Sequence, residues 1–296
     1  MISLFPIFKF FWKITEKSDN ANLKKQIDPD NILRTYDINY ANDDNTYHNL
    51  DFYRPDKISE KLPCIIDIHG GGWMYGTKRL NQNYCLHLAN NGFTVFNINY
   101  RLCPEVTMKE QLQDILIALK FIGENKEKFK ISDNYILAGD SAGGQLAIFA
   151  YSICKSEKLR IAFDCIKNNL DIKGLLLTSP APFMNEKGPV GIYTKPMLGK
   201  DYKTDKAYCF MDFNNFVDEI SFPPTALITS SGDILARKQT KRLHQLLIKQ
   251  NADVYLQDFS GFSGLFLPHV FSALNPSGKV SKSAIKNACD FLKSKI

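Results

Sequence analysis

A glycine-rich turn near the middle of the chain constrains the fold more than any other feature. Residues 139–144 read GDSAGG, which fits the pattern G-x-S-x-G between an expected strand and an expected helix. The chain must reverse sharply there, which leaves the serine in a strained conformation with its hydroxyl projecting outward. Side chains at Gly139 or Gly143 would collide with neighbouring backbone. The turn predicts Ser141 as a nucleophile, with a helix-capping serine as the alternative.

Short apolar runs alternate with amphipathic stretches on both sides of this turn, which predicts βαβ units and a mostly parallel sheet. We expect strands at 46–53, 62–68, 93–99, 135–138, 172–178, 225–230 and 253–259, and helices at 82–90, 110–124, 145–154, 238–250 and 283–292. Right-handed crossovers between such strands give an α/β/α sandwich. Neither a repeat nor a low-complexity linker divides the chain, so residues 1–296 are expected to form a single domain.

A second glycine cluster follows the strand expected at 62–68. Residues 69–73 read HGGGW, and successive glycines let the backbone approach a substrate with its N–H groups turned inward. Together with the N–H of Ala142, those of Gly71 and Gly72 are expected to form an oxyanion hole. A phosphate-binding turn is the rival interpretation, but the pattern G-x-x-x-x-G-K-[ST] is absent. His69 is expected to orient this loop by hydrogen bonding rather than to act in catalysis.

A serine hydroxyl is a weak nucleophile and needs an adjacent base, so the five histidines are the candidates. His48 and His69 precede the serine in the chain. His87 and His244 fall within expected helices, where a surface or hydrogen-bonded histidine is the ordinary interpretation. His269 follows the last expected strand and is therefore the expected base.

The carboxylate that orients the base is expected between the serine and the histidine in the chain. Asp233 directly follows the strand expected at 225–230 and would hold the imidazole of His269 in the correct tautomer. Asp258, at the end of the last expected strand, is the competing candidate. We favour Asp233 on chain position, and helix capping is the structural alternative for both.

The first fourteen residues, MISLFPIFKFFWKI, are strongly apolar but are interrupted by Pro6, Lys9 and Lys13. The segment is too short and too charged to span a bilayer. Apolar residues recur at helical spacing, which indicates an amphipathic helix. We expect it to pack on its own domain, within an N-terminal cap or surface element over residues 1–45. Contact with a membrane surface and an atypical signal peptide are the less favoured alternatives.

A second irregular stretch, 182–222, is rich in Pro, Gly, Tyr and Phe and has no clear period. It is too long for a simple connection, so we expect an inserted cap there.

Composition argues against several functions. The formal net charge is +6, but the 37 Lys and Arg residues are scattered, which disfavours a nucleic-acid partner. The seven cysteines are odd in number and show no C-x-x-C spacing, which disfavours a disulfide framework and favours a reducing, cytoplasmic location. Since H-E-x-x-H, zinc-binding spacings and a dinucleotide fingerprint are all absent from the sequence, neither a metal nor an organic cofactor is expected.

Taken together, these motifs resemble those of the hormone-sensitive-lipase-like branch of the α/β-hydrolase fold, a group of carboxylesterases and acetyl esterases. The matching elements, in the order of the family, are HGGGW at 69–73, NYRL-x-PE at 99–105, GDSAGG at 139–144, GD-x-L at 232–235 and PH-x-F at 268–271. Two departures concern the pocket. The acid motif reads DILAR where many relatives have D-P-L-x-D, and the loop before His269 is unusually apolar.

The resemblance implies a mostly parallel central sheet flanked by helices, with caps from the N-terminal segment and from 182–222. With the triad, it predicts a serine hydrolase that cleaves small carboxylic esters with short acyl chains through an acyl-enzyme. An amidase or aryl-formamidase with the same triad, and a non-catalytic small-molecule binding protein, are the alternatives. Arg101, in the NYRL stretch, is expected to hold the nucleophile turn by pairing with Asp140 or a backbone carbonyl.

Overall fold

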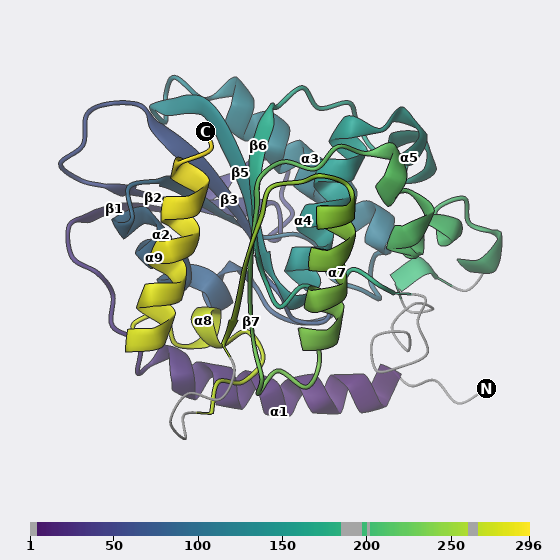
Figure 1. Ribbon diagram of the computed structural model, residues 1–296, viewed down its shortest axis with the longest axis horizontal. Coiled ribbons are helices and arrows are strands. Elements are labelled where there is room, and N and C mark those ends of the chain that lie inside the picture. Colours follow the sequence, from purple (N-terminus) through teal and green to yellow (C-terminus); the bar gives the residue numbers. More distant parts are fainter. Residues whose placement is uncertain (1–4, 185–196, 200–201, 260–265) are drawn as a thin grey trace.

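The computed structural model describes residues 5–184, 197–199, 202–259 and 266–296. Eight strands among these residues form one sheet, in the order β1-β2-β4-β3-β5-β6-β7-β8. The sheet runs through the middle of the molecule (Figure 1). Pairings of β2 with β1 and β4 are antiparallel, and every other pairing is parallel. The strands are β1 (Ile32–Asn39), β2 (Asn49–Pro55), β3 (Leu62–Ile68), β4 (Thr94–Ile98), β5 (Ile131–Asp140), β6 (Ile172–Thr178), β7 (Thr225–Ser230) and β8 (Val254–Phe259).

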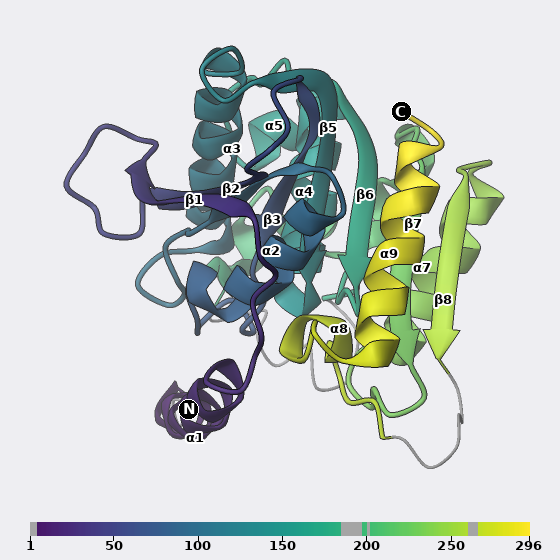
Figure 2. The ribbon, with the colours of Figure 1, turned by 90° about the vertical axis from the view of Figure 1, so that its left-hand side faces the viewer.

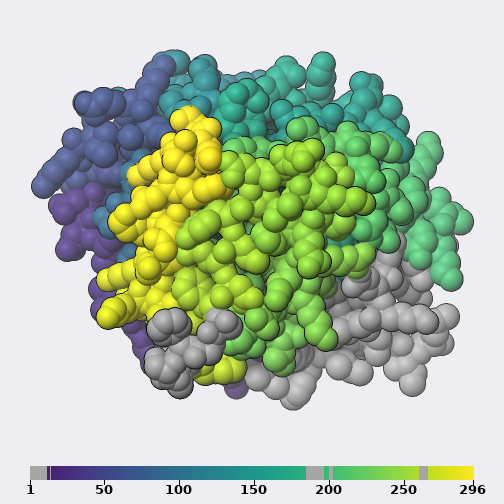
Figure 3. Space-filling view, in the orientation of Figure 1, coloured from purple at the N-terminus to yellow at the C-terminus, as the bar shows by residue number. Residues whose placement is uncertain are grey.

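Helices cover both faces of this sheet, which makes the molecule a three-layer sandwich (Figure 2). One face carries α3 (Met108–Glu124), α4 (Ser141–Lys155), α5 (Glu157–Ala162) and α7 (Arg237–Lys249). The other carries α2 (Gln82–Asn90), α8 (Phe271–Leu274) and α9 (Lys279–Lys293). In the space-filling view the described residues of α7 and α9 occupy the middle of the face that is shown (Figure 3). The expected α/β-hydrolase sandwich is therefore confirmed.

Each central strand supplies side chains to both layers, as the period of a strand requires. In β3, Ile66 and Ile68 are fully buried in the group of apolar side chains under α3 and α4, whereas Ile65 is buried under α2 and α9. A strand buried on both faces reads as a continuous apolar run, which is why 62–68 and 172–178 were predicted with the bounds observed.

The N-terminal segment forms helix α1 (Phe5–Leu23), which lies across the end of the sheet where the parallel strands finish (Figures 1 and 2). The predicted helix is confirmed, and it continues nine residues beyond the apolar start of the chain, from 15 to 23. None of the helices in the described ranges is both long enough and apolar enough to cross a membrane.

The described part of the 182–222 stretch contains four short 3₁₀ turns: η3 (Tyr202–Thr204), η4 (Tyr208–Met211), η5 (Phe213–Asn215) and η6 (Val217–Glu219). These turns pack on α4 through aromatic rings. Phe216 meets Phe149 of α4 edge-on, with ring centroids 5.4 Å apart, and Phe213 meets Phe216 at 5.1 Å. Residues 185–196 and 200–201 of the expected cap lie outside the described residues.

Candidate active site

The turn between β5 and α4 has the strained geometry that its glycines indicate. Ser141 has φ of +51°, in the left-handed region that few non-glycine residues adopt. A Cβ atom added to Gly143 would lie 1.9 Å from the carbonyl oxygen of Ile68, and one added to Gly139 would lie 2.5 Å from the carbonyl oxygen of Gly143. The expected collisions at these two glycines are confirmed, and the turn projects the Ser141 hydroxyl beyond the sheet.

The structure brings the three residues of the expected triad together at the carboxyl end of the sheet. His269 Nε2 lies 2.9 Å from Ser141 Oγ, and His269 Nδ1 lies 2.9 Å from Asp233 Oδ1. Ser141 follows β5, Asp233 follows β7, and His269 comes after β8 in the chain. The arrangement has the hydrogen-bond reach required of a nucleophile, a base and the acid that orients the base.

Asp233 is 2% exposed and receives several hydrogen bonds. The backbone N–H groups of Leu235 and Ala236 donate to its Oδ1 at 3.1 and 2.9 Å. Burial by itself raises the pKa of Asp233, but the hydrogen bond and charge of His269, together with the Ala236 N–H, bring that pKa below its ordinary value. A charged Asp233 keeps the proton of the imidazole on Nδ1, so the lone pair of Nε2 faces the serine.

Asp258, the competing candidate for the acid, has a different partner. Arg237 donates to its two carboxylate oxygens from Nε at 3.0 Å and from Nη2 at 2.9 Å. This pair ties the end of β8 to the start of α7. The structure thus brings Asp233 to His269 and leaves Asp258 in a surface ion pair.

The loop after β3 has the backbone that its glycines permit. Gly71 and Gly72 have φ of +111° and +57°, and a Cβ on Gly71 would lie 2.0 Å from the carbonyl oxygen of Tyr75. The N–H of Gly70 is already bonded to Asp140 Oδ1 at 2.8 Å. The N–H groups of Gly71 and Gly72 have no acceptor in the described part of the chain, so both are available to a ligand. Ala142, in the first turn of α4, presents a third N–H without a partner inside its helix.

Two further groups position this loop. The buried ring of His69 donates from Nδ1 to the carbonyl oxygen of Gly70 at 2.7 Å and stacks on Tyr100 at 4.5 Å. Burial lowers the pKa of His69 to about 4, so the ring is neutral at pH 7. The prediction that His69 orients the loop by hydrogen bonding is confirmed.

A buried amide that the sequence did not single out joins the loop to the nucleophile turn. Asn81 Nδ2 donates to Asp140 Oδ1 and to Asp67 Oδ2, both at 2.8 Å. Burial raises the pKa of Asp140, and burial together with Asp140 raises the pKa of Asp67 to about 7. Because Asp140 also receives the Gly70 N–H, this cluster sets the position of the loop. Asn81 lies in none of the matched motifs, and only the fold reveals its role.

The predicted pairing of Arg101 with Asp140 is wrong. Arg101 donates from Nε and Nη2 to the carboxylate of Asp114 on α3, at 2.9 and 2.6 Å. Asp114 is fully buried, and a buried carboxylate needs a cation or hydrogen bonds to offset its desolvation. Arg101 satisfies that need, while Asp140 obtains its hydrogen bonds from Gly70 and Asn81.

A cavity of about 630 Å³ opens above Ser141, within the size range of small-molecule sites. One wall is apolar and includes Leu235, Ala236, Ala273 and Leu274. Helix α1 also lines the cavity, through Trp12, Thr15, Asp19, Asn22 and Leu23. No described residue between 182 and 222 is among those that line the cavity. Within the described ranges, no group of three or more His, Cys, Asp or Glu residues is arranged to hold a metal ion.

Known proteins share this architecture and parts of the sequence. The structure of an inhibited esterase B from Lactobacillus rhamnosis superposes on the chain with a TM-score of 0.92 and 25% sequence identity. The match covers 98% of this chain and 96% of the esterase B chain. A putative α/β hydrolase, R526, of Acanthamoeba polyphaga mimivirus is 22% identical over 77% of the chain and 65% of its own length. Carboxylesterase NlhH of Mycobacterium tuberculosis is 32% identical over 32% of the chain and 30% of its own length. The chain thus spans less than two thirds of these two sequence relatives.

The sheet order, the serine turn and the likeness to esterase B give the chain the α/β-hydrolase fold, and its motifs resemble those of the hormone-sensitive-lipase-like branch. More particularly, residues 50–247 match the model of the BD-FAE family, and the chain belongs to that family.

Proposed function

We propose that this protein hydrolyses carboxylic esters of small molecules, with Ser141 as nucleophile, His269 as general base and Asp233 as the acid that orients His269. One observation carries the proposal: an unbroken line of hydrogen bonds, each 2.9 Å long, runs from Asp233 through His269 to Ser141 at the floor of a cavity. The esterase B likeness supports the same class of reaction.

The reaction follows from the positions of these atoms. His269 Nε2 takes the hydroxyl proton as Ser141 Oγ attacks the acyl carbon, and the negative charge that develops on the carbonyl oxygen is received by the N–H groups of Gly71, Gly72 and Ala142. The bond to the alcohol oxygen then breaks, and His269 returns the proton to the departing alcohol. Water, deprotonated by His269, attacks the acyl-serine in the second half and releases the acid.

The cavity supports short acyl chains. Its volume is about 630 Å³, and side chains of α1 such as Trp12 and Leu23 are among those that line it. The structure of esterase B has also been solved with a C4-C4 tributyrin phosphonate inhibitor, so that protein accepts an inhibitor with short chains. We therefore propose that turnover of p-nitrophenyl esters is highest at two to four acyl carbons.

The proposal is tested with the purified protein and its Ser141→Ala variant. We expect turnover of p-nitrophenyl acetate by the wild type and a loss of roughly 10⁴-fold in the variant. A fluorophosphonate should modify Ser141 stoichiometrically, as peptide mass mapping would show. More than a tenth of wild-type turnover in a folded Ser141→Ala variant would contradict the assignment, and faster cleavage of an N-formyl aryl amine than of the ester would favour an amidase.

We also propose that the chain forms one domain, in which α1 and the 182–222 stretch are cap elements. All seven cysteines are free, which supports a reducing, cytoplasmic compartment. Limited proteolysis tests the domain proposal, because separate domains would be released as stable fragments.

A further inference from the structure

Three large apolar side chains are exposed at the edge of the catalytic cavity. Ile234 and Phe266 are 90% and 74% exposed, and Leu235 is 51% exposed and also lines the cavity. A single exposed apolar side chain is ordinary on a protein surface, whereas a group of them beside a binding cavity marks an interaction site. We call these three residues the apolar rim.

The apolar rim is one surface, although its residues come from two loops. The loop after β7 carries Ile234 and Leu235, and the segment after β8 carries Phe266. The two loops run side by side, because Gly232 pairs with Pro268 in a parallel bridge. A Cβ on Gly232 would lie 3.1 Å from Cε2 of Phe266, so the phenyl ring reaches the loop that carries Ile234.

Positive charge borders the apolar rim where α7 begins. This helix has the sequence RKQTKRLHQLLIK, which contains five Lys and Arg residues and no acidic residue. Arg237 is paired with Asp258. Lys238, four residues after Ile234, is exposed and forms no ion pair with a described residue. The rim is therefore bordered by a cation that is available to an anionic partner.

Helix α1 lies across the same end of the sheet and carries further cations (Figures 1 and 2). Lys13 and Lys17 are exposed and have no ion pair among the described residues. Glu16, between them, is the exposed acidic residue of this part of the helix. The positive charge beside the rim is thus extended along α1.

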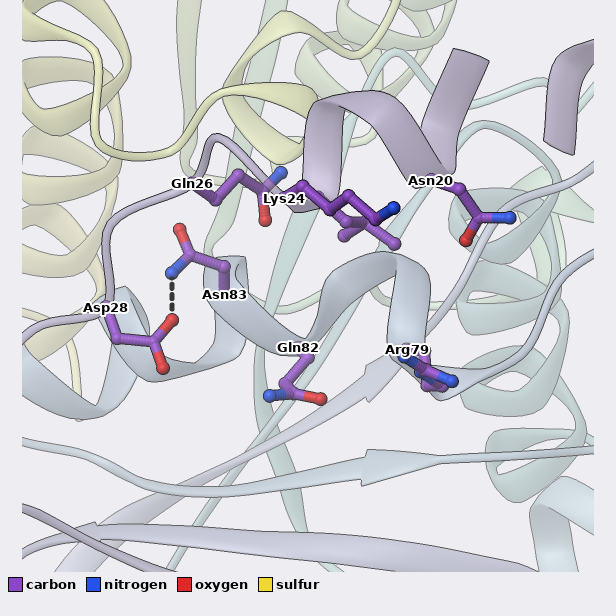
Figure 4. A pocket seen from close by; sticks show the side chains of 8 residues that line it. Asn20, Lys24, Gln26, Asp28, Arg79, Gln82 and Asn83 are labelled. Carbon is purple, nitrogen blue, oxygen red and sulfur yellow. Dashed lines mark hydrogen bonds between the residues drawn. The ribbon is translucent and has the colours of Figure 1, made fainter. Parts of the chain in front are cut away.

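A polar hollow of about 220 Å³ at the C-terminal end of α1 adds two more cations (Figure 4). Lys24 and Arg79 line it, both are exposed, and neither is ion-paired within the described ranges. Asp28, which lines the same hollow, is already paired with Arg34 at 2.5 Å. Cations without counter-ions in the described chain therefore lie at both the rim and α1.

We propose that the apolar rim docks on a lipid surface with anionic headgroups, so that the mouth of the cavity faces the lipid. Protruding apolar side chains enter the region between headgroups and acyl chains, and neighbouring Lys and Arg side chains attract anionic lipids. A second copy of this chain would bring the same positive charge to the rim and be repelled, which favours the lipid as the occupant. The proposal goes beyond ester hydrolysis and does not depend on it.

Sedimentation of the purified protein with vesicles tests the proposal. We expect vesicles of phosphatidylcholine with about one third phosphatidylglycerol to bind the wild type at least about tenfold more tightly than phosphatidylcholine alone, because several cations act together on an anionic surface. Raising the NaCl concentration to about 0.5 M should remove most of this preference, since salt screens exposed charges.

Two sets of variants separate the apolar and the charged contributions. Ile234→Ser combined with Phe266→Ser should weaken binding to the mixed vesicles by about tenfold or more, because two apolar side chains no longer leave water. Lys238→Glu should reduce the preference for phosphatidylglycerol by about fivefold or more. Ile161→Ser and Lys167→Glu are the matched controls and should bind as the wild type does. Both residues are exposed and lie between α4 and β6, at the end of the sheet where β6 begins.

Each result decides the proposal. Equal binding of the wild type to the two kinds of vesicle, or binding to neither, would overturn it, as would a control variant that loses as much binding as the rim variant. A dimer in lipid-free ultracentrifugation that Phe266→Ser dissociates would make the rim an interface between copies and would also overturn it. Should the double variant not fold, an unchanged lipid preference of Lys238→Glu would contradict the proposal.

Turnover of p-nitrophenyl acetate without vesicles tests the proposed function separately. Ile234 and Phe266 are not among the residues that line the cavity, so the double variant should keep this turnover while it loses vesicle binding. An inactive wild type that binds anionic vesicles would overturn the proposed function and leave the docking surface in place.

Discussion

Arg237 donates to both carboxylate oxygens of Asp258, at 3.0 and 2.9 Å, whereas Asp233 faces His269. The two aspartates at neighbouring strand ends are thereby separated into different roles. We predict that Asp233→Asn lowers kcat for p-nitrophenyl acetate by roughly 10³ to 10⁴, because an amide favours the wrong imidazole tautomer. Asp258→Asn should change kcat by less than about threefold, since partly exposed ion pairs contribute little.

Both variants should be checked for folding by circular dichroism before their kinetics are compared. If Asp258→Asn proves the more damaging of two folded variants, the acid has been misassigned, while Ser141 and His269 keep their proposed roles.

Asn81 connects the nucleophile turn to the oxyanion loop, so its removal should affect the transition state more than substrate binding. We predict that Asn81→Leu lowers kcat by about 10- to 100-fold with a smaller change in KM, as expected when donors to an oxyanion are displaced. Asn81 and Asn91 flank α2 at its two ends, and Asn91 lies outside the cavity, so Asn91→Leu is the matched control and should keep wild-type kinetics. An unaltered kcat in a folded Asn81→Leu variant would contradict this prediction, because it would show that Asp140 positions the loop after β3 without the hydrogen bond from Asn81.

The pKa of Asp67, raised from 3.8 to about 7, predicts a pH dependence of stability. Between these values the folded protein holds a proton that the unfolded chain releases, so this contribution to the free energy of unfolding is present at low pH and falls as pH rises toward 7. Asp67→Asn lacks this titration. The groups that face Asp67 are Asp140, Asn81, Cys85 and Tyr84.

Urea unfolding at pH 5, 6, 7 and 8 measures the effect. The stability of wild type minus that of Asp67→Asn should decrease from pH 5 to about 7 and then level off. Asp133→Asn is the control, because the pKa of exposed Asp133 lies below its ordinary value and outside this window. A difference that stays constant, or increases with pH, would contradict the raised pKa of Asp67.

Two helical glycines should respond very differently to alanine. A Cβ on Gly143 in α4 would lie 1.9 Å from the carbonyl oxygen of Ile68, whereas one on Gly123 in α3 would meet only the flexible end of Leu170, at 2.7 Å. Because backbone cannot yield as a side chain can, we predict that Gly143→Ala costs about 3 kcal/mol or more or prevents folding. Gly123→Ala should lie within about 1 kcal/mol of wild type, helped by the helix propensity of alanine. Thermal and urea unfolding of both variants measure the two losses of stability. Equal losses for Gly143→Ala and Gly123→Ala would contradict this prediction.

Much of the fold follows from local pattern, because the central strands are buried on both faces and read as apolar runs. The elements that were not predicted are an edge strand and two short helices. Strand β1 was not predicted, since it pairs with β2 at the edge of the sheet and its residues are half-buried or exposed, without an apolar run. The short helices α5 and α8 were also missed, because six and four residues carry too little period to be recognised.

The proximity of Ser141, His269 and Asp233 could be expected from the sequence, because their motifs are contiguous and follow strands in a fixed order. The surrounding residues could not, since each depends on a contact between distant parts of the chain. Arg101 was expected to pair with Asp140 or a backbone carbonyl of the nucleophile turn, but the fold brings the buried carboxylate of Asp114 on α3 to it instead.

The ring of Trp12 lies so close to Gly72 that a Cβ there would be 2.4 Å from its Cζ2 atom. The helix that closes the cavity therefore rests on the same glycine that is proposed to stabilise the oxyanion. By thermodynamic linkage, a ligand that binds more tightly when α1 is docked also shifts the population toward docked α1, by the same factor. Binding of a ligand in the cavity would therefore be coupled to docking of α1 on the loop after β3, because Trp12 of α1 contacts Gly72 of that loop.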